Sequence, residues 1–140
     1  MECLFCRIGR GELAAHVVSE DKETIAVLDI HPRAPGHTMV IPRAHRETIL
    51  DLSTAELQSV FQAVQGVTKL LGAALAPDGF TIGINHGRAA GQAVEHLHVH
   101  VVPRYRGDGG SSLHGVVNNP PSESPSELLG RIRAAKGGGV

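Results

Sequence analysis

The sequence predicts one α+β domain, built from a mostly antiparallel sheet and one long helix. A single apolar stripe at helical spacing runs through residues 57–75, and strand-like segments lie on both sides of it in the chain. Strands that follow one another around one helix are typical of an antiparallel layer, whereas a doubly wound parallel sheet alternates strands and helices. The chain has 140 residues, which is the length of one domain.

The long helix is expected over residues 53–76. Its apolar stripe repeats every three to four residues and consists of Leu57, Val60, Phe61, Val64, Val67, Leu71, Ala74 and Leu75. Ser53 followed by Glu56 is a capping-box pattern, in which two side chains satisfy free backbone N–H groups of the first turn. Pro77 and Gly79 come directly after the stripe and predict the end of the helix.

The remaining regular segments are interpreted as strands, separated by Gly, Pro and Asp, at residues 15–19, 24–30, 36–42, 79–85 and 95–103. Beyond residue 105 the regular patterns stop, and the last stretch holds 8 of the 17 Gly and 3 of the 8 Pro. We therefore predict a domain over residues 1–105 and a Gly/Pro/Ser-rich C-terminal extension over residues 106–140. Residues 126–135 can form a short helix, and residues 137–139 are expected to be flexible.

The charge balance limits the classes of partner. The chain has 13 Lys and Arg against 14 Asp and Glu, a formal net charge of −1. This balance argues against a nucleic-acid polymer or an acidic membrane as the partner, because both call for an excess of basic residues. The most apolar run, Leu70 to Ala76, is far shorter than the ~18 residues of a membrane span. The N-terminus lacks the apolar stretch of a signal peptide, so a cytoplasmic protein is expected.

The chain has nine histidines, and three lie in the segment His96-Leu97-His98-Val99-His100-Val101-Val102-Pro103. In a strand, side chains alternate between faces, so the three histidines share one face and the apolar residues share the other. The apolar face can pack against the long helix and leave the histidines toward a pocket. The spacing alone leaves two functions open: ligands of a metal ion, or a nucleophile with an acid–base partner.

The residues around this segment resemble a known family. Gly91-Gln92 followed by three histidines that alternate with apolar residues is similar to the signature of the histidine triad (HIT) family. The resemblance extends upstream to Asp29-Ile30, Pro35-Gly36-His37 and Ile41-Pro42-Arg43, and covers about residues 3–105. It implies a HIT-like fold and a homodimer in which the sheets of two subunits join.

The resemblance also implies a reaction, the cleavage of a purine nucleotide conjugate at its α-phosphate. His98 matches the nucleophile of the family, which forms a nucleotidyl-histidine that water then hydrolyses. A covalent route through a labile phosphorus–nitrogen bond replaces one difficult displacement by two easier ones. His100 matches the position that contacts phosphate oxygens or the leaving group, and His37 matches a histidine that orders the cluster. The implied substrates are nucleoside phosphoramidates, as in the Hint-like branch, or dinucleoside polyphosphates.

Five further residues match the nucleotide-binding positions of the family. Asp29 is placed to accept hydrogen bonds from the ribose hydroxyls, and Ile30 to pack against the base. Asn85, Gly91 and Gln92 match positions near the phosphates and the leaving group.

The chain departs from the family pattern at three positions, where relatives often have other residues. These are His31 in place of Asn, His86 in place of a second Asn, and Ala93 in place of Ser or Thr. The departures leave the predicted nucleophile intact, but they put the substrate preference in doubt.

The only two cysteines, Cys3 and Cys6, have a spacing that lets both thiolates reach one Zn²⁺. The alternative is a thioredoxin-like redox pair, which is expected after a strand. The zinc-containing branch of the family adds a His after the Ile-Pro-Arg strand and the first triad His, which match His45 and His96. The resemblance therefore implies a structural Cys₂His₂ zinc site in a short N-terminal knuckle.

Two other functions remain open from the sequence. One is a nucleotide-binding regulatory protein with little turnover. The other is a hydrolytic metalloenzyme in which His96 and His98 hold a catalytic metal.

Overall fold

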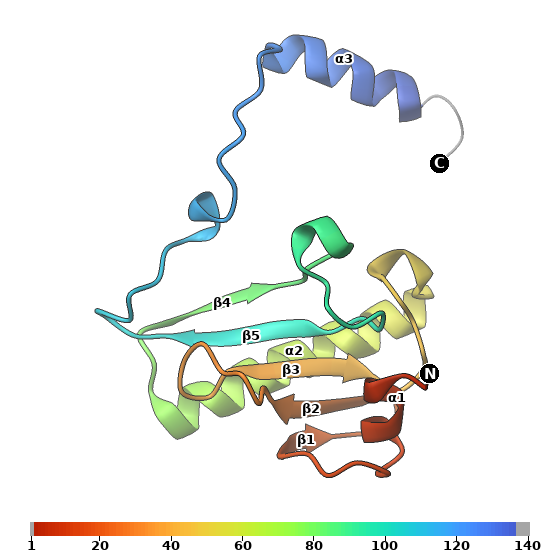
Figure 1. Cartoon of the computed structure of the whole chain (residues 1–140), viewed down its shortest axis with the longest axis vertical. Coiled ribbons are helices and arrows are strands. Elements are labelled where there is room, and N and C mark those ends of the chain that lie inside the picture. Colours follow the sequence, from red (N-terminus) through yellow and green to blue (C-terminus); the bar gives the residue numbers. More distant parts are fainter. Residues whose placement is uncertain (1, 137–140) are drawn as a thin grey trace. The chain divides into compact units, whose positions relative to one another are not determined.

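The structure, a computed structural model, describes residues 2–136. The chain divides into two compact units, residues 1–110 and 111–140. The described residues of the first unit form two α-helices, two short 3-10 helices (Ile49–Asp51 and Arg88–Ala90) and five strands. Figure 1 shows these α-helices and strands, namely α1 (Leu4–Gly9), β1 (Val17–Glu20), β2 (Thr24–Leu28), β3 (Thr38–Pro42), α2 (Thr54–Leu75), β4 (Gly79–Gly83) and β5 (Val99–Arg104). No helix within residues 2–136 is long and apolar enough to cross a membrane.

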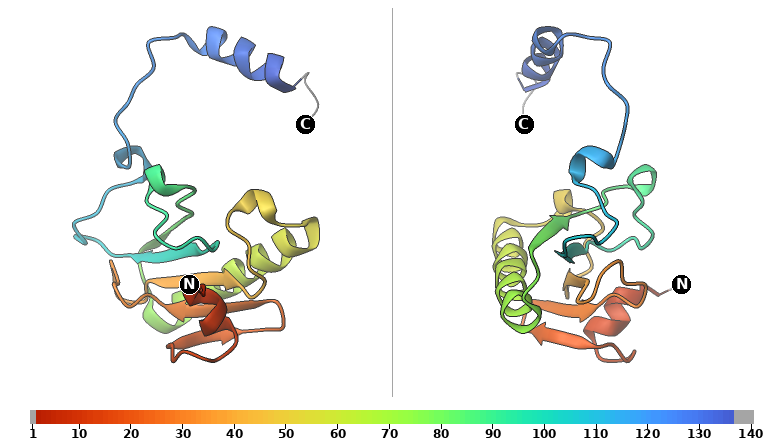
Figure 2. Two further views of the ribbon diagram at one scale, coloured as in Figure 1. Left: turned by 45° about the vertical axis from the view of Figure 1, so that its right-hand side comes forward. Right: turned by 90° about the vertical axis from the view of Figure 1, so that its left-hand side faces the viewer.

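The five strands form one antiparallel sheet in the order β1-β2-β3-β5-β4. Figure 2 shows that α2 covers one face of this sheet, while the short helix α1 lies on the opposite face. The predicted α+β architecture, with a mostly antiparallel sheet and one long helix, is confirmed.

The long helix α2 forms as the sequence predicts. The Ser53 hydroxyl accepts a hydrogen bond from the Glu56 N–H, and the Glu56 carboxylate accepts one from the Ser53 N–H. Ala76 ends the helix in the left-handed region, at φ 47°. The apolar stripe of α2 packs against buried residues of β2, β3 and β5, and this core consists of Val60, Val64, Val67, Leu71, Ala26, Val40, Val99 and Val101.

A second, smaller core lies on the other face of the sheet, under α1. It consists of Phe5, Ile25, Val27, Met39 and Ile41. Because β2 and β3 are covered on both faces, they are buried along almost their whole length. These two strands therefore give a rigid support to whatever lies beside α1.

The strands are shorter than the sequence predicts, and the difference matters most for β5. The predicted strand at residues 95–103 begins only at Val99, where the ladder with β3 starts opposite Val40. Continuing this register by two residues would place Leu97 opposite Pro42, which has no N–H to donate. The Leu97 N–H instead donates to the Arg46 carbonyl, at 2.6 Å. His96 and His98 therefore lie in the segment just before the strand, and His96 is part of a bend.

Within residues 111–136, the described part of the second unit, there is one α-helix, α3 (Pro125–Lys136). The Glu127 N–H donates to the Ser124 hydroxyl, and the Ser124 N–H donates to the Glu127 carboxylate, which is again a capping box. The predicted short helix over residues 126–135 is confirmed. The flexibility predicted for residues 137–139 lies outside the described residues.

The turn before β3 contains a glycine and packs closely against the end of α2. Gly36 has φ +86°, and a Cβ there would meet Leu75 Cδ1 at 2.4 Å and Pro103 Cγ at 3.2 Å. Gly36→Ala should lower the free energy of unfolding by more than about 1 kcal/mol, because the new methyl group is both strained and crowded. Urea unfolding measures this change.

Gly66 is the matched control, because it lies inside α2 and, apart from its own helix backbone and chain neighbours, nothing lies within 4 Å of a new Cβ. Gly66→Ala should raise the free energy of unfolding by about 0.5–1 kcal/mol. Equal stability of Gly36→Ala and the parent protein would contradict this account of the turn.

Candidate functional site

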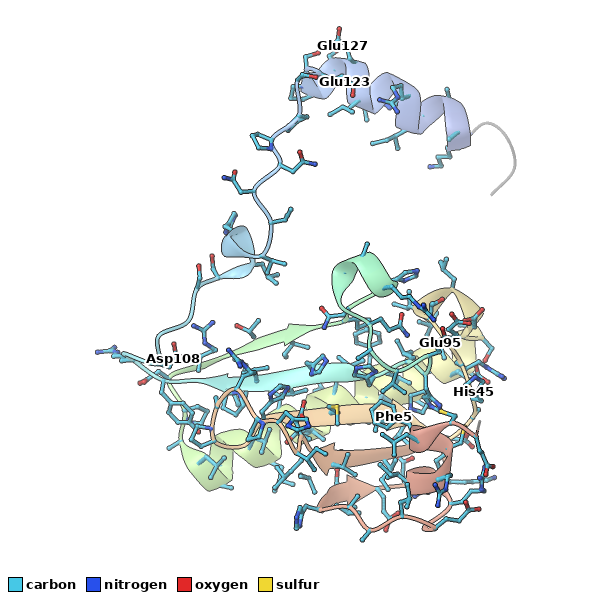
Figure 3. All side chains as sticks on the ribbon, viewed as in Figure 1. Phe5, His45, Glu95, Asp108, Glu123 and Glu127 are labelled. Carbon is cyan, nitrogen blue, oxygen red and sulfur yellow. The ribbon has the colours of Figure 1, made fainter. Side chains whose placement is uncertain are left out.

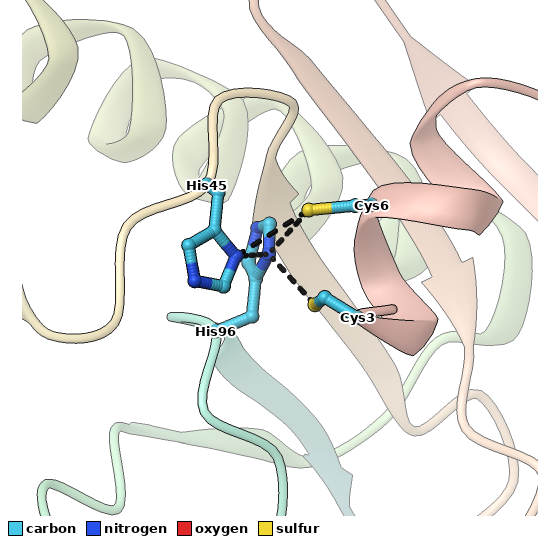
Figure 4. A group of neighbouring side chains, drawn as sticks. All are labelled: Cys3, Cys6, His45 and His96. Atoms are coloured by element: carbon cyan, nitrogen blue, oxygen red, sulfur yellow. Dashed lines mark hydrogen bonds between the residues drawn. The ribbon is translucent and has the colours of Figure 1, made fainter. Parts of the chain in front are cut away.

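Four potential metal ligands meet beside α1 (Figure 4). Cys3 and Cys6 come from the start of α1, His45 from the loop after β3, and His96 from the segment before β5. The His96 Nδ1 lies 3.4 Å from the Cys3 Sγ and 3.5 Å from the Cys6 Sγ. The His45 Nδ1 lies 3.4 Å from the Cys6 Sγ and 3.3 Å from the His96 Nδ1.

These separations fit a tetrahedral zinc ion. With bond lengths of about 2.05 Å for Zn–N and 2.3 Å for Zn–S, tetrahedral geometry places two nitrogens about 3.3 Å apart and a nitrogen and a sulfur about 3.6 Å apart. Both cysteines are free thiols, so neither is withdrawn into a disulfide. The structure thus brings together all four residues that the sequence predicts as metal ligands.

The protonation of His96 also suits a metal ligand. Its Nε2 lies 2.8 Å from the Pro42 carbonyl oxygen, which can only accept, so Nε2 carries the proton. The lone pair is then on Nδ1, the atom that faces the thiols. Burial lowers the pKa of His96, which favours the neutral imidazole that a metal needs.

His98 is oriented by the neighbouring main chain. Its Nδ1 lies 2.9 Å from the His96 carbonyl oxygen, so Nδ1 carries the proton and Nε2 keeps its lone pair. The ring is only 7% exposed and makes edge contacts with the rings of Phe5 and His100. The metal cluster contains His96 without His98, so the geometry does not favour a catalytic metal held by both residues.

A chain of hydrogen bonds also fixes the proton positions of His37 and His100. The Arg33 N–H donates to the His37 Nδ1 at 3.1 Å, so the proton of a neutral His37 is on Nε2. This Nε2–H points at the His100 Nδ1, 2.9 Å away, which must accept. A neutral His100 therefore carries its own proton on Nε2, so this N–H can donate a hydrogen bond.

Burial keeps both of these imidazoles neutral. It lowers the pKa of His37, helped by Arg33 and opposed by Asp29, whose Oδ2 lies 3.5 Å from the His37 Nε2. Burial, with the nearby His98 and His37, lowers the pKa of His100 from 6.5 to about 4. At neutral pH the pair offers hydrogen-bond donors without adding positive charge.

Asp29, His37 and His100 also have potential ligand atoms within 4.8 Å of one another. Their protons argue against a metal ion, because the Arg33 N–H occupies the His37 Nδ1 and leaves the proton on Nε2. A metal at that Nε2 would have to displace the proton and leave an imidazolate. Of the two groups found among the described residues, the Cys3 cluster is therefore the better candidate for a metal ion.

A pocket of about 430 Å³ lies beside Asp29 and His37. Its lining comes from the end of β2 and the turn before β3, and consists of Leu28, Asp29, Pro32, Arg33, Ala34, Pro35, Gly36 and His37. The Asp29 Oδ1 accepts a hydrogen bond from the His31 N–H at 2.8 Å, which orients the carboxylate. Ile30, the predicted neighbour of the base, is 76% exposed.

The predicted phosphate-side residues lie in the loop between β4 and β5. Gly91 has φ +95°, and a Cβ there would come within 3.9 Å of the Asn85 side chain, which is exposed. The Gln92 amide is fully engaged by the main chain: it accepts from the Gly87 N–H and donates to two carbonyl oxygens, those of Glu47 and Val94. In this structure Gln92 therefore connects two loops, and its contact with a nucleotide stays a prediction.

Sequence reasoning missed Phe5, a buried residue whose ring contacts both His96 and His98. The available signal was its position between Cys3 and Cys6 in a chain with only three Phe, one Tyr and no Trp. The carbonyl of Pro42 and the N–H of Arg33 were also missed, and no sequence pattern identifies them. These backbone groups depend on how distant strands pair.

Comparison with known proteins agrees with this geometry. The family model described as "HIT domain" matches residues 10–107. The chain belongs to the HIT family. An uncharacterized HIT-like protein of Methanocaldococcus jannaschii is 44% identical over 117 residues, which are 84% of this chain and 90% of the relative. The adenosine 5'-monophosphoramidase of Schizosaccharomyces pombe is 32% identical over 136 residues, 97% of this chain and 98% of that protein.

Solved structures show the same fold. A HIT family protein from Bacillus anthracis superposes with a TM-score of 0.87 at 33% identity, over 99% of this chain and 97% of that one. A Zn-bound histidine triad family protein from Mycobacterium smegmatis has a TM-score of 0.73 at 31% identity, over 96% of this chain and 98% of that one. The predicted HIT-like fold is confirmed.

Because the pKa of His100 is lowered in the folded protein, the free energy of unfolding should depend on pH. Between pH 6.5 and 4 the unfolded chain binds a proton at this residue and the folded chain does not, so stability falls as the pH falls through this range. At pH 5 this effect lowers the free energy of unfolding by about 2 kcal/mol relative to its value well above pH 6.5. His100→Gln should therefore lose less stability than the parent protein between about pH 7.5 and 5, as measured by urea unfolding.

Asp29, His37 and His98 are the charged or titratable neighbours of His100, and all three are unchanged in this variant. His16→Gln, at an exposed position, is the control and should keep the parent pH dependence. The same pH dependence in His100→Gln and the parent protein would contradict the lowered pKa.

Proposed function

We propose that this HIT protein hydrolyses purine nucleotide conjugates at the α-phosphate through a nucleotidyl intermediate on His98. The observation that carries the proposal is the hydrogen bond from the His98 Nδ1–H to the His96 carbonyl, which leaves the Nε2 lone pair free for attack. The relation to an adenosine 5'-monophosphoramidase along almost the whole chain supports a nucleoside phosphoramidate as the substrate.

In the first step, the His98 Nε2 attacks the α-phosphorus, a P–N bond forms, and the bond from phosphorus to the leaving group breaks. The His100 Nε2–H donates a hydrogen bond to the leaving group, because its Nδ1 already accepts from His37, and water supplies the proton that the leaving group takes up. In the second step, water attacks the phosphorus and the P–N bond breaks, which restores the free imidazole and releases the nucleoside monophosphate.

The pocket beside His37 is the proposed nucleoside site. Its volume of about 430 Å³ is in the range of small-molecule pockets. We assign the Asp29 carboxylate to the ribose hydroxyls and the exposed Ile30 to the base. Asn85 and Gly91 are assigned to the phosphate side, and Gln92 holds the loop that carries them.

We assign a structural zinc ion to Cys3, Cys6, His45 and His96. Their spacing fits a tetrahedral zinc, and a solved relative is zinc-bound. When bound, the metal cross-links α1, the loop after β3 and the segment before β5, and it takes no part in the transfer of the nucleotidyl group. A cytoplasmic homodimer remains our expectation for the state in which the enzyme works.

The first test of this proposal is His98→Ala. Loss of the covalent nucleophile should reduce turnover of adenosine phosphoramidate by several orders of magnitude, up to about 10⁶-fold. Nucleotide binding and zinc content should be retained, because the residues assigned to them are unchanged. Initial rates, equilibrium binding of the nucleoside monophosphate and metal analysis measure the three properties.

His86→Ala is the control. His86 is exposed and lies in the loop between β4 and β5, and the variant should keep most of the activity. Mass spectrometry of rapidly quenched parent protein should locate the nucleotidyl group on His98. Full turnover in folded His98→Ala, or an adduct on His100, would reject the mechanism. Tight binding without turnover by the parent protein would favour a regulatory role.

Metal analysis of the reduced protein should give one zinc per chain, and Cys3→Ser should lower this content, since one of the four ligands is lost. Asp29→Asn should leave the zinc content unchanged, because the second group of ligand atoms does not bind the metal. A content well below one zinc per chain in freshly reduced parent protein would remove the proposed site.

A further inference from the structure

We propose that Phe5 is a positioning residue for His98 and that it carries the influence of the metal knuckle to the nucleophile. Phe5 lies in α1 between Cys3, the residue before the helix, and Cys6, and both cysteines belong to the metal cluster. Figure 3 shows Phe5 and His45 at the α1 end of the sheet. This inference depends on the proposed function only for the identity of the nucleophile.

The Phe5 ring contacts the imidazole rings of His98 and His96. Its centroid lies 5.1 Å from that of His98, with an interplanar angle of 72°, and 5.9 Å from that of His96, with an angle of 85°. Both are edge contacts, an arrangement that aromatic rings prefer over direct stacking. Phe5 itself is 5% exposed and belongs to the core under α1, so its own ring has little freedom.

His98 needs such a contact because its hydrogen bond leaves one motion unrestricted. The bond from Nδ1–H to the His96 carbonyl fixes one atom of the ring, but the ring can still swing about that bond. The edge contact with His100, at 4.9 Å, limits this swing, and the contact with Phe5 limits it further. A misplaced reacting atom is costly, since an error of about 1 Å can reduce a rate about 10²-fold.

The position of Phe5 in turn depends on the metal cluster. Helix α1 has six residues, and Cys3 at its N-terminus makes no side-chain capping bond. So short a helix is not stable alone, because too few hydrogen bonds offset the cost of nucleation. Metal ligation at Cys3 and Cys6 anchors both ends of the turn that carries Phe5.

Two connections therefore join the metal centre to His98. One runs through His96, whose Nδ1 belongs to the metal cluster and whose carbonyl accepts from the His98 Nδ1–H. The other runs through Cys3, Cys6 and Phe5 by packing. Removal of the metal weakens both connections, whereas Phe5→Leu weakens only the second and leaves all four ligands in place.

The test compares Phe5→Leu with Ile8→Ala in the zinc-loaded protein. Ile8 lies on the same helix and packs against the same core, so Ile8→Ala loosens α1 without removing the ring from His98. In Phe5→Leu we expect a fall in kcat of about 10- to 100-fold with KM within about twofold, because binding groups are unchanged. Zinc content should stay equal in all three proteins.

A spectroscopic measurement makes the test independent of turnover. In ¹⁵N-histidine-labelled protein at pH 8, the parent and Ile8→Ala should each show one sharp His98 signal with the proton on Nδ1. In Phe5→Leu, and in parent protein whose metal has been removed by a chelator, this signal should broaden or show both tautomers. Phe5→Met serves if Phe5→Leu does not fold, since it keeps the volume but not the rigid ring.

An unchanged His98 signal and unchanged kcat in folded, zinc-loaded Phe5→Leu would overturn the inference. Equal effects of Ile8→Ala and Phe5→Leu would also overturn it, because they would show a general loosening of α1. If the parent protein lacks turnover while the His98 signal still responds to Phe5→Leu, the proposed function fails and the positioning role stands.

Discussion

Backbone groups decide where the proton sits on the imidazoles of His37, His96 and His98, and the rest of the chemistry depends on this constraint. Carbonyl oxygens of Pro42 and His96 can only accept, so they place protons on the His96 Nε2 and the His98 Nδ1. The Arg33 N–H can only donate, so it reverses the arrangement at His37. The start of β5 and the segment just before it thus carry the proposed metal ligand, nucleophile and hydrogen-bond donor, each with a different neighbour.

The same constraint separates two groups of residues that look alike by composition. The Cys3 cluster and the group formed by Asp29, His37 and His100 both have ligand atoms within 4.8 Å of one another. In the first cluster a lone pair of His96 faces the other ligands, whereas in the second a proton of His37 does. The first therefore suits a cation, and the second suits the polar groups of a nucleotide.

The sequence predicts the fold class, the limits of α2 and the alternation of His98 and His100 with Val99 and Val101, because burial against the helix enforces period two. It does not predict where β5 begins, since that point depends on Pro42 in β3, a strand that is far away in the sequence but adjacent in the sheet. The contact of Phe5 with His98 is hidden for the same reason. Patterns along the chain report which face is buried, and they do not report which backbone group meets which side chain.

The central claim is most directly tested by ¹⁵N chemical shifts of the imidazole nitrogens in the zinc-loaded parent protein. Each histidine is assigned by its individual substitution, at a pH where all imidazoles are neutral. The account predicts the proton on Nδ1 of His98 and on Nε2 of both His37 and His100. A proton on the Nε2 of His98 would contradict it, because the nitrogen assigned to attack the phosphorus would have no free lone pair.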